Sequence, residues 1–144
     1  MEKIAVIGGG AAGMMASIFA ARRGMEVHVY EKNEKTGKKL YITGKGRCNL
    51  TNACDIEELL ESVKSNKKFL YSAFYGFTNQ DAYDFFEAEG LKLKVERGNR
   101  VFPMSDRSAD VLDTLRRAMR SAGVQVHLNT EVKSVRKQED GFTL

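Results

Sequence analysis

The stretch from Lys3 to Glu31 constrains the fold more strongly than any other part of this sequence. It begins with the apolar run Lys3–Ile7, which is long enough for a buried parallel strand and too short for a helix. Three glycines follow with the spacing G-x-G-x-x-G, and they are Gly8, Gly10 and Gly13. A helical pattern begins at these glycines, and the next apolar run, Met25–Tyr30, ends in the acid Glu31. A strand before the motif, a helix after it and an acid about 20 residues later predict a βαβ dinucleotide-binding unit.

Each part of this motif has a physical role. Gly8 permits a tight turn, Gly10 lets the backbone approach a pyrophosphate, and Gly13 lets the helix pack closely on the strand. The N–H groups of the first helical turn lack helical partners, so they attract phosphates. Glu31 can accept hydrogen bonds from both hydroxyls of a ribose, and its charge disfavours the 2′-phosphate of NADP as first ligand. The alternative is a glycine-rich turn that binds nothing, and the complete context of the motif favours the nucleotide.

The remaining sequence predicts further helices and strands. The first helix is expected to place Ala12, Ala16, Phe19 and Ala20 on one face and to end at Gly24. Downstream we expect a helical stretch over residues 55–90, with a capping box from Asp55 to Glu58 and a second cap at Thr78. A β-hairpin over 91–102 and a helix capped by Ser105 or Ser108 should follow. The last predicted elements are a third parallel strand over 124–128, buried on both faces, and an antiparallel β pair over 131–144. The pattern indicates an α/β domain.

Three separated motifs resemble one known family. They are VIGGGAAGMMA from Val6, GKKLYITGKGRCNLTN from Gly37 and RVFPMSDRSADVLDTL from Arg100. In this order they resemble the BaiN-like (YhiN-like) FAD-dependent oxidoreductases, which are also described as aminoacetone-oxidase-like flavoproteins. The resemblance covers the whole chain and implies a Rossmann-like FAD-binding fold of the glutathione-reductase type, interrupted by a second domain and completed by a C-terminal return. Because the sequence stops inside its last predicted strand, we expect residues 1–144 to be the N-terminal part of that domain.

The resemblance also implies cofactor contacts. Ala12 and Gly13 would face the FAD pyrophosphate, and Glu31 with Lys32 would hold the adenosine ribose. Val132, just past the third predicted strand, would meet the adenine through its backbone. The segment from Lys39 to Asn49 would extend along the cofactor toward the flavin, and its expected contacts are Lys39, Gly44, Gly46, Arg47, Cys48 and Asn49.

The residues between Lys32 and Cys54 favour FAD over NAD. Glycines at positions 37, 44 and 46 argue for a loop, and so long a loop in a compact domain usually has a function. NAD-binding domains do not need such a segment. Arg47 is a rigid cation with several donors, so it suits a phosphate or the O2 edge of a flavin.

The resemblance implies a flavin-dependent oxidoreductase that transfers a hydride between NAD(P)H and a small organic substrate. The hydride chemistry belongs to the cofactor, and the sequence assigns no catalytic acid or base. An alternative is a flavoprotein segment with structural FAD and an RNA-related or other binding role, and the net charge of +4 and the pI near 9.1 suggest nucleic acid as a partner. The basic residues are scattered along the chain, however, which is more typical of a solvated surface than of a nucleic-acid groove.

The remaining reactive residues have simpler interpretations. No apolar segment resembles a signal peptide or a membrane span, and two cysteines suit a reducing cytoplasm. Cys48 and Cys54 are spaced more widely than the pair of flavin disulfide reductases, so a redox disulfide is disfavoured, and they cannot complete a metal site. His28 and His127 stand among valines and are expected to be structural, and Asp106 is expected to be a turn residue.

Overall fold

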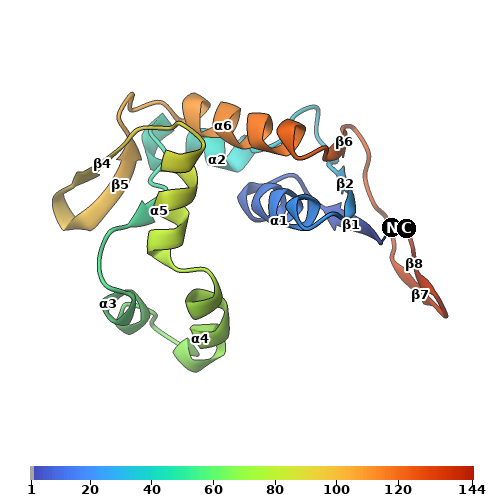
Figure 1. Cartoon of the computed structure of the whole chain (residues 1–144), viewed down its shortest axis with the longest axis horizontal. Helices are drawn as coiled ribbons and strands as arrows, with labels where there is room; N and C mark the ends of the chain where they lie inside the picture. The colour runs from blue at the N-terminus through green and yellow to red at the C-terminus, as the bar shows by residue number, and fades with distance from the viewer. Residues whose placement is uncertain (1) are drawn as a thin grey trace. The chain divides into compact units, whose positions relative to one another are not determined.

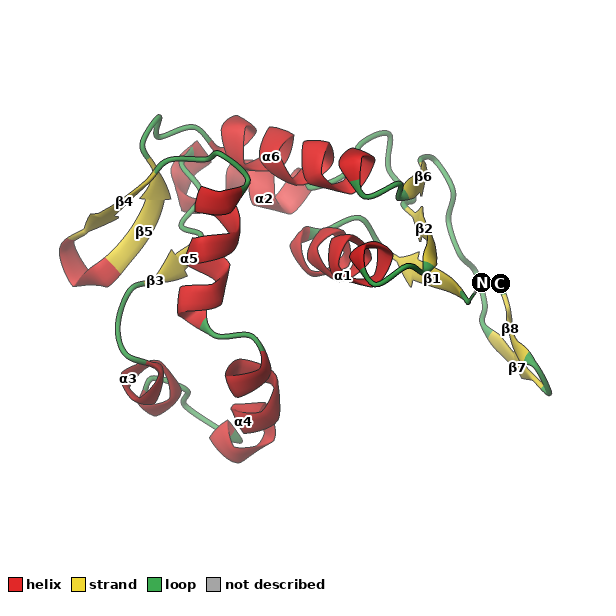
Figure 2. Cartoon of the chain, in the orientation of Figure 1, coloured by secondary structure: helices red, strands yellow, loops and turns green. Residues whose placement is uncertain are grey.

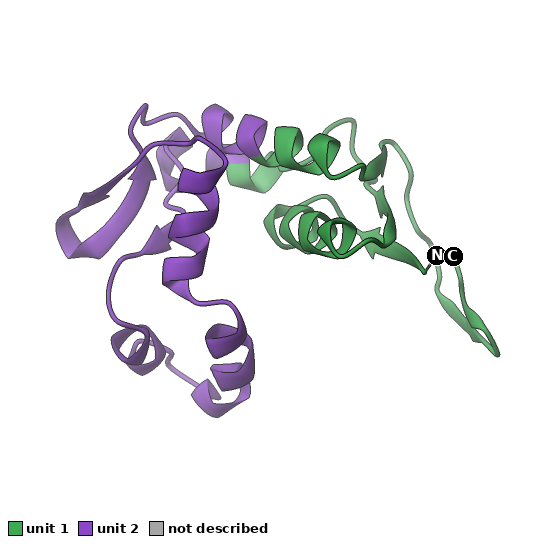
Figure 3. Ribbon diagram, in the orientation of Figure 1, with its two compact units in different colours: residues 1–40, 115–144 green, residues 41–114 purple. Residues whose placement is uncertain are grey.

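The computed structural model of the chain describes residues 2–144 and divides into two compact units (Figure 3). Unit 1 combines the N-terminal segment as far as Leu40 with Leu115–Leu144, and unit 2 is Tyr41–Thr114. Among the described residues, no helix has both the length and the apolar content needed to cross a membrane.

Unit 1 is built on a parallel sheet whose strand order is β1-β2-β6 (Figures 1 and 2). The strands are β1 (Lys3–Ile7), β2 (Glu26–Tyr30) and β6 (Gln125–His127), and helix α1 (Ala11–Arg22) connects the first two. The register runs from Lys3 opposite Glu26 to Ile7 opposite Tyr30. The predicted βαβ unit and its third parallel strand are therefore confirmed.

The buried face of α1 differs from the predicted one. Ala12 and Ala16 are exposed, whereas Met14, Ser17 and Ile18 are buried. The larger Met14 and Ile18 side chains remove more apolar area from water than alanines do, so they decide which face turns inward. Ser17 is accommodated because its hydroxyl donates to the Met14 carbonyl oxygen at 2.7 Å.

The core of unit 1 also receives side chains from β2 and from the part of α6 (Ser108–Ser121) that belongs to this unit. Its buried apolar residues include Val27, Val29, Leu115, Ala118 and Met119. The end of α1 is as predicted, since Gly24 takes the left-handed conformation (φ 85°) just after the helix.

The third strand is not buried on both faces. Val126 is 40% exposed and Leu128 is 41% exposed. The reason is topological, because β6 lies at the edge of the three-stranded sheet and has β2 as its single neighbour there. The antiparallel pair that follows is shorter than predicted and consists of β7 (Arg136–Gln138) and β8 (Gly141–Thr143).

Unit 2 contains a small antiparallel sheet with the order β3-β5-β4 and several helices. Its strands are β3 (Thr51–Asn52), β4 (Leu93–Glu96) and β5 (Arg100–Pro103). Its helices include α3 (Ile56–Glu61), α4 (Lys67–Gly76) and α5 (Asn79–Ala88). Part of the predicted loop after β2 is occupied by helix α2 (Lys38–Ile42) and by the 3-10 turn that follows it (Thr43–Gly46). The predicted hairpin is confirmed, with β4 and β5 joined through Arg97–Asn99.

Of the predicted helix caps in unit 2, the one at Thr78 is confirmed and the one at Asp55 is wrong. Thr78 and Asp81 form a reciprocal capping box at the start of α5. Asp55 precedes α3 but makes no side-chain capping bond, so the predicted box with Glu58 is wrong. The Ser108 hydroxyl donates to the Tyr41 carbonyl oxygen at 2.5 Å and the Arg107 N–H donates to Ser105 Oγ at 3.4 Å, so the predicted cap of α6 at Ser105 or Ser108 stays a prediction.

The aromatic residues between positions 69 and 86 do not form one core. Phe85 and Phe86 of α5 are buried and meet edge to face. Helix α4 has no buried residue, and its Phe69 is 85% exposed.

Candidate functional site

A cavity of about 440 Å³ opens in unit 1 where the strands of the parallel sheet end. Ile7 and Tyr30 are the last residues of β1 and β2, and Glu31 follows directly. The lining residues are Ile7, Gly8, Gly10, Tyr30, Glu31, Lys32, Asn33, Lys35, Gly37, Lys38, Lys39, Thr130, Glu131 and Val132. Ligands of open α/β sheets bind at the carboxyl ends of the strands, so this cavity has the position of a ligand site.

Glu31 is a buried carboxylate held by backbone donors. It is 7% exposed. Its Oε2 accepts the Gly9 N–H at 2.8 Å, and its Oε1 accepts the Asn33 N–H at 2.8 Å and Asn33 Nδ2 at 2.7 Å. Burial raises the pKa of Glu31, but these donors outweigh it, and the pKa lies below its usual value. The side chain is therefore a fixed negative charge at neutral pH.

Gly8 and Gly13 have the backbone environments that the sequence predicted for them, and the approach of Gly10 to a pyrophosphate stays a prediction. Gly8 has φ 97°, which favours glycine, and its N–H donates to the Tyr30 carbonyl oxygen at 2.9 Å. A Cβ at Gly13 would lie 1.9 Å from the Gly8 carbonyl oxygen, so no larger residue fits without a shift. A Cβ at Gly10 would meet nothing within 4 Å, and this glycine lines the cavity.

Gly9 is a site residue that the spacing motif does not include. A Cβ there would lie 2.7 Å from Thr36 Cγ2 and 3.3 Å from Glu31 Oε2. Its carbonyl oxygen accepts the Gly37 N–H at 2.9 Å. Gly9 thus joins the first βα turn to Glu31 and to the 36–37 segment, and the signal for it in the sequence was the run of three consecutive glycines, of which it is the middle one.

Several predicted residues do come together at the cavity. Gly8, Gly10, Glu31, Lys32, Lys39 and Val132 all line it. Lys35 and Lys38 line it too and were missed individually, although the lysine-rich composition of this segment was visible. Ala12 and Gly13 do not line the cavity, so their contact with a pyrophosphate stays a prediction.

Backbone bonds hold the segment after β6 against the segment after β2. The Thr130 N–H donates to the Glu31 carbonyl oxygen at 2.9 Å, and the Asn129 N–H donates to that of Asn33 at 3.0 Å. This pairing places Thr130, Glu131 and Val132 on the cavity wall. Val132 therefore lines the cavity, and its contact with the adenine stays a prediction.

The other predicted cofactor residues lie in unit 2, in the turn that follows α2. Four residues there, Gly44, Lys45, Gly46 and Cys48, have φ between 56° and 81°. The Cys48 N–H donates to the Thr43 carbonyl oxygen at 3.1 Å, and the Leu50 N–H donates to that of Val101 at 2.9 Å. Gly44 and Asn49 are exposed, Gly46 is half-buried and Cys48 is buried.

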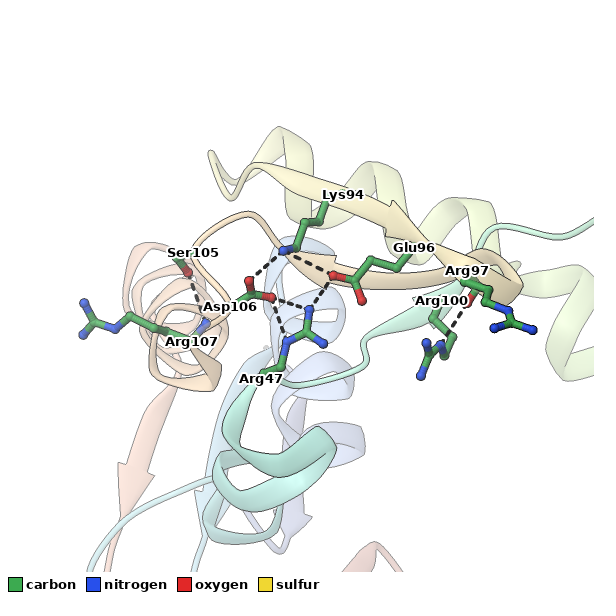
Figure 4. Close-up of polar contacts among 8 residues, drawn as sticks. All are labelled: Arg47, Lys94, Glu96, Arg97, Arg100, Ser105, Asp106 and Arg107. Carbon is green, nitrogen blue, oxygen red and sulfur yellow. Dashed lines mark hydrogen bonds and ion pairs between the residues drawn. The ribbon is translucent and has the colours of Figure 1, made fainter.

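Arg47 belongs to a cluster of four charged side chains (Figure 4). Its Nε and Nη2 donate to Asp106 Oδ1 at 2.8 and 2.5 Å, and Nη2 also reaches Glu96 Oε1 at 2.5 Å. Lys94 Nζ completes the cluster, at 2.6 Å from Asp106 Oδ2 and 3.3 Å from Glu96 Oε1. Lys94 and Arg47 lower the pKa of Asp106, and Arg47 and Lys94 lower that of Glu96. The turn residue Asp106 thus also carries an ion-pair role that sequence spacing did not reveal.

The two histidines bond to each other across the sheet of unit 1. His28 Nδ1 lies 2.9 Å from His127 Nε2, and His28 Nε2 lies 3.0 Å from Glu26 Oε1. The His127 ring also stacks on Tyr30 at 4.9 Å between centroids. Both histidines are half-buried and have hydrogen-bond partners, as expected of structural side chains.

We expect Cys48 to resist thiol reagents in the native protein. Both cysteines are free, but Cys48 is 3% exposed, and burial raises its pKa to about 11. The thiolate is the reactive form, so little of Cys48 is available at pH 8. Thiol titration should find Cys48 only after unfolding, and a Cys54→Ser variant should show no native thiol. Alkylation of Cys48 in the folded protein would contradict this burial.

The fold and the cavity together define a dinucleotide-binding Rossmann domain, with the glycine turn, the first helix and the acid after the second strand in their expected places. The chain belongs to the HI0933-like protein Rossmann domain family, whose model matches residues 2–144. This agrees with the predicted family resemblance and confirms the fold class.

Curated relatives and solved structures are similar to this chain over most of its length. The 3-dehydro-bile acid delta(4,6)-reductase of Clostridium scindens is 34% identical over 146 residues, covering 100% of this chain and 35% of the relative. The ribosomal RNA dihydrouridine synthase of Escherichia coli is 34% identical over 139 residues, covering 96% of this chain and 34% of the relative. The chain spans about a third of the length of the curated relatives it matches.

The structural neighbours share the fold at low identity. THI4 of Thermovibrio ammonificans has a TM-score of 0.64 at 11% identity, covering 98% of this chain and 44% of that one. A flavocytochrome c3 fumarate reductase has a TM-score of 0.62 at 23% identity, covering 96% of this chain and 29% of that one.

Proposed function

We propose that this chain is the FAD-binding portion of a flavin-dependent oxidoreductase. The observation that carries the proposal is Glu31, a buried carboxylate fixed by three hydrogen bonds at the carboxyl end of β2, on the wall of the cavity. A carboxylate at this place accepts the ribose hydroxyls of an adenine dinucleotide. Membership of the HI0933-like family and the resemblance to flavoproteins support FAD as that dinucleotide.

The residues of unit 1 fit the adenosine diphosphate part of FAD. Gly8 and Gly10 leave the backbone open at the start of α1, where unpaired N–H groups and the helix dipole attract phosphates. Lys32, Lys35 and Lys39 add positive charge around the cavity. Val132 and Thr130 close the side where the adenine would lie. Bound there, FAD supplies the hydride-transfer chemistry, and this chain supplies binding and orientation.

The names of the relatives support a shared reaction class. A 3-dehydro-bile acid delta(4,6)-reductase and a dihydrouridine synthase both reduce carbon–carbon double bonds, and in both substrates a carbonyl is conjugated to such a bond. We therefore propose that the whole protein reduces an electron-poor C=C bond of this kind. NAD(P)H supplies the hydride equivalent, a proton completes the addition, and NAD(P)⁺ leaves.

A small organic molecule is the first candidate substrate, and the proposed setting is the cytoplasm. A uracil in ribosomal RNA is the second candidate, because two of the relatives carry that activity in their names. The net charge of +4 is compatible with RNA but does not select it. We assign no residue of this chain to the selection of the substrate.

The test is the visible spectrum and turnover of the purified full-length protein. We expect flavin absorbance, either as isolated or after adding FAD, and oxidation of NAD(P)H that depends on an acceptor. A conjugated enone and a ribosomal RNA transcript are compared as acceptors under the same conditions. A folded protein that takes up no FAD would refute the proposal, and turnover with the transcript alone would select the RNA substrate.

A further inference from the structure

The four-charge cluster joins three segments of unit 2 that are far apart in sequence. Arg47 comes from the turn after α2, Lys94 and Glu96 from β4, and Asp106 from the segment between β5 and α6 (Figure 4). The side chains are about one-third exposed, which leaves the ion pairs partly shielded from water. The Arg47 guanidinium also lies over the Phe102 ring, 4.1 Å from its centroid.

This geometry does not suit Arg47 as an anion ligand. Its Nε and Nη2 form the edge that recognises a phosphate with two parallel bonds, and Asp106 occupies that edge. Two cations and two carboxylates also balance, so the cluster offers no net positive charge to a pyrophosphate. Arg47 could bind the cofactor in this way only by breaking its bonds to Asp106.

The segment that Arg47 anchors needs external support. Lys45 and Cys48 adopt the left-handed conformation (φ 56° and 59°), which costs energy for residues other than glycine. Such conformations persist only where surrounding contacts over-determine them. The Arg47 ion pairs, the buried Cys48 side chain and the Leu50 bond to β5 supply those contacts.

We propose that Arg47 is a positioning residue: through Glu96 and Asp106 it fixes the backbone of Gly44–Asn49, and the backbone rather than the guanidinium meets FAD. This inference rests on the proposed function and on the family resemblance, which alone assigns the 44–49 segment to the cofactor. It replaces the expectation that Arg47 itself contacts a phosphate or the flavin.

The two roles predict opposite effects of Asp106→Asn. If Arg47 acts as an anchor, Asp106→Asn and Arg47→Ala both loosen the segment, weaken FAD binding by roughly three- to ten-fold and lower the midpoint potential of the bound flavin. The effects should not add, so the double variant should bind FAD about as well as Arg47→Ala. If Arg47 contacts the cofactor, Asp106→Asn unmasks its charge and should tighten FAD binding and raise the potential.

The experiment measures FAD dissociation constants and midpoint potentials in the full-length protein. Glu61→Gln is the matched control, because it removes the acid of an exposed ion pair with Lys67 in the same unit and should change neither quantity. Arg47→Lys and Glu96→Gln provide milder versions if a stronger variant fails to fold, and Arg47→Lys should restore part of the affinity.

Three results would overturn the inference. They are opposite shifts for Asp106→Asn and Arg47→Ala, additive losses in the double variant, and lower thermal stability with unchanged affinity and potential, which would mark the cluster as purely structural. A wild-type protein that binds no FAD would instead refute the proposed function, so the two failures are distinguishable.

Discussion

Replacing Gly13 by alanine is expected to destabilise the protein by about 3 kcal/mol and to abolish measurable FAD binding. The new Cβ would lie 1.9 Å from the Gly8 carbonyl oxygen, which is backbone and cannot turn aside as a side chain could. The start of α1 must then move away from β1. That movement displaces the N–H groups that are expected to face the pyrophosphate. Thermal unfolding and a flavin titration would measure the two losses.

Gly10→Ala is the matched control for this prediction. Gly10 has φ −79° and open space where a Cβ would lie, so alanine should leave the stability of the apo protein within about 0.5 kcal/mol of wild type. The added methyl group would extend into space beside the cavity, so FAD affinity should still fall. If Gly13→Ala folded and bound FAD like wild type, the close contact between helix and strand would not be needed.

The βαβ unit was predictable because its signals are local. The stretch from Lys3 to Glu31 contains two apolar runs, the glycine motif between them and the acid at its end. All of these signals constrain the same βαβ segment. The hairpin β4–β5 and the capping box at Thr78 were predictable for the same reason. Asp55 was not, because a residue suited to capping only permits the bond, and the local backbone decides whether it forms.

The features that sequence reasoning missed depend on distant neighbours. Arg47 lies 49 and 59 residues from its two acidic partners, so no local pattern could show that it is paired. The inward face of α1 depends on which side chains fill the space beside β2, and alanine periodicity carries little information about volume. The exposure of Val126 follows from its place on an edge strand, which a strand's own composition does not specify.

Glu31→Ala is expected to raise the FAD dissociation constant about ten-fold or more. Two ribose hydroxyls would lose a charged acceptor, and a hydrogen bond to a charged group contributes roughly 1.5–3 kcal/mol. The structure adds a second loss, because the N–H groups of Gly9 and Asn33 would lose the acceptor that positions them. Both effects act on the same wall of the cavity. We therefore expect a large loss of FAD affinity and only a small fall in melting temperature.

Two control variants separate the acceptor effect from a simple charge effect. Glu31→Gln keeps one carbonyl oxygen but turns an amide NH₂ toward either Gly9 or Asn33, so its loss of affinity should be smaller than that of alanine and still measurable. Glu131→Ala removes an exposed acid from the same cavity wall, where its ion-pair partner is Lys133. If charge alone mattered, both alanine variants would tighten FAD binding by relieving repulsion with the phosphates. We expect Glu31→Ala to weaken binding and Glu131→Ala to leave it unchanged or slightly tighter, and equal behaviour of the two would mean that the ribose does not bind at Glu31.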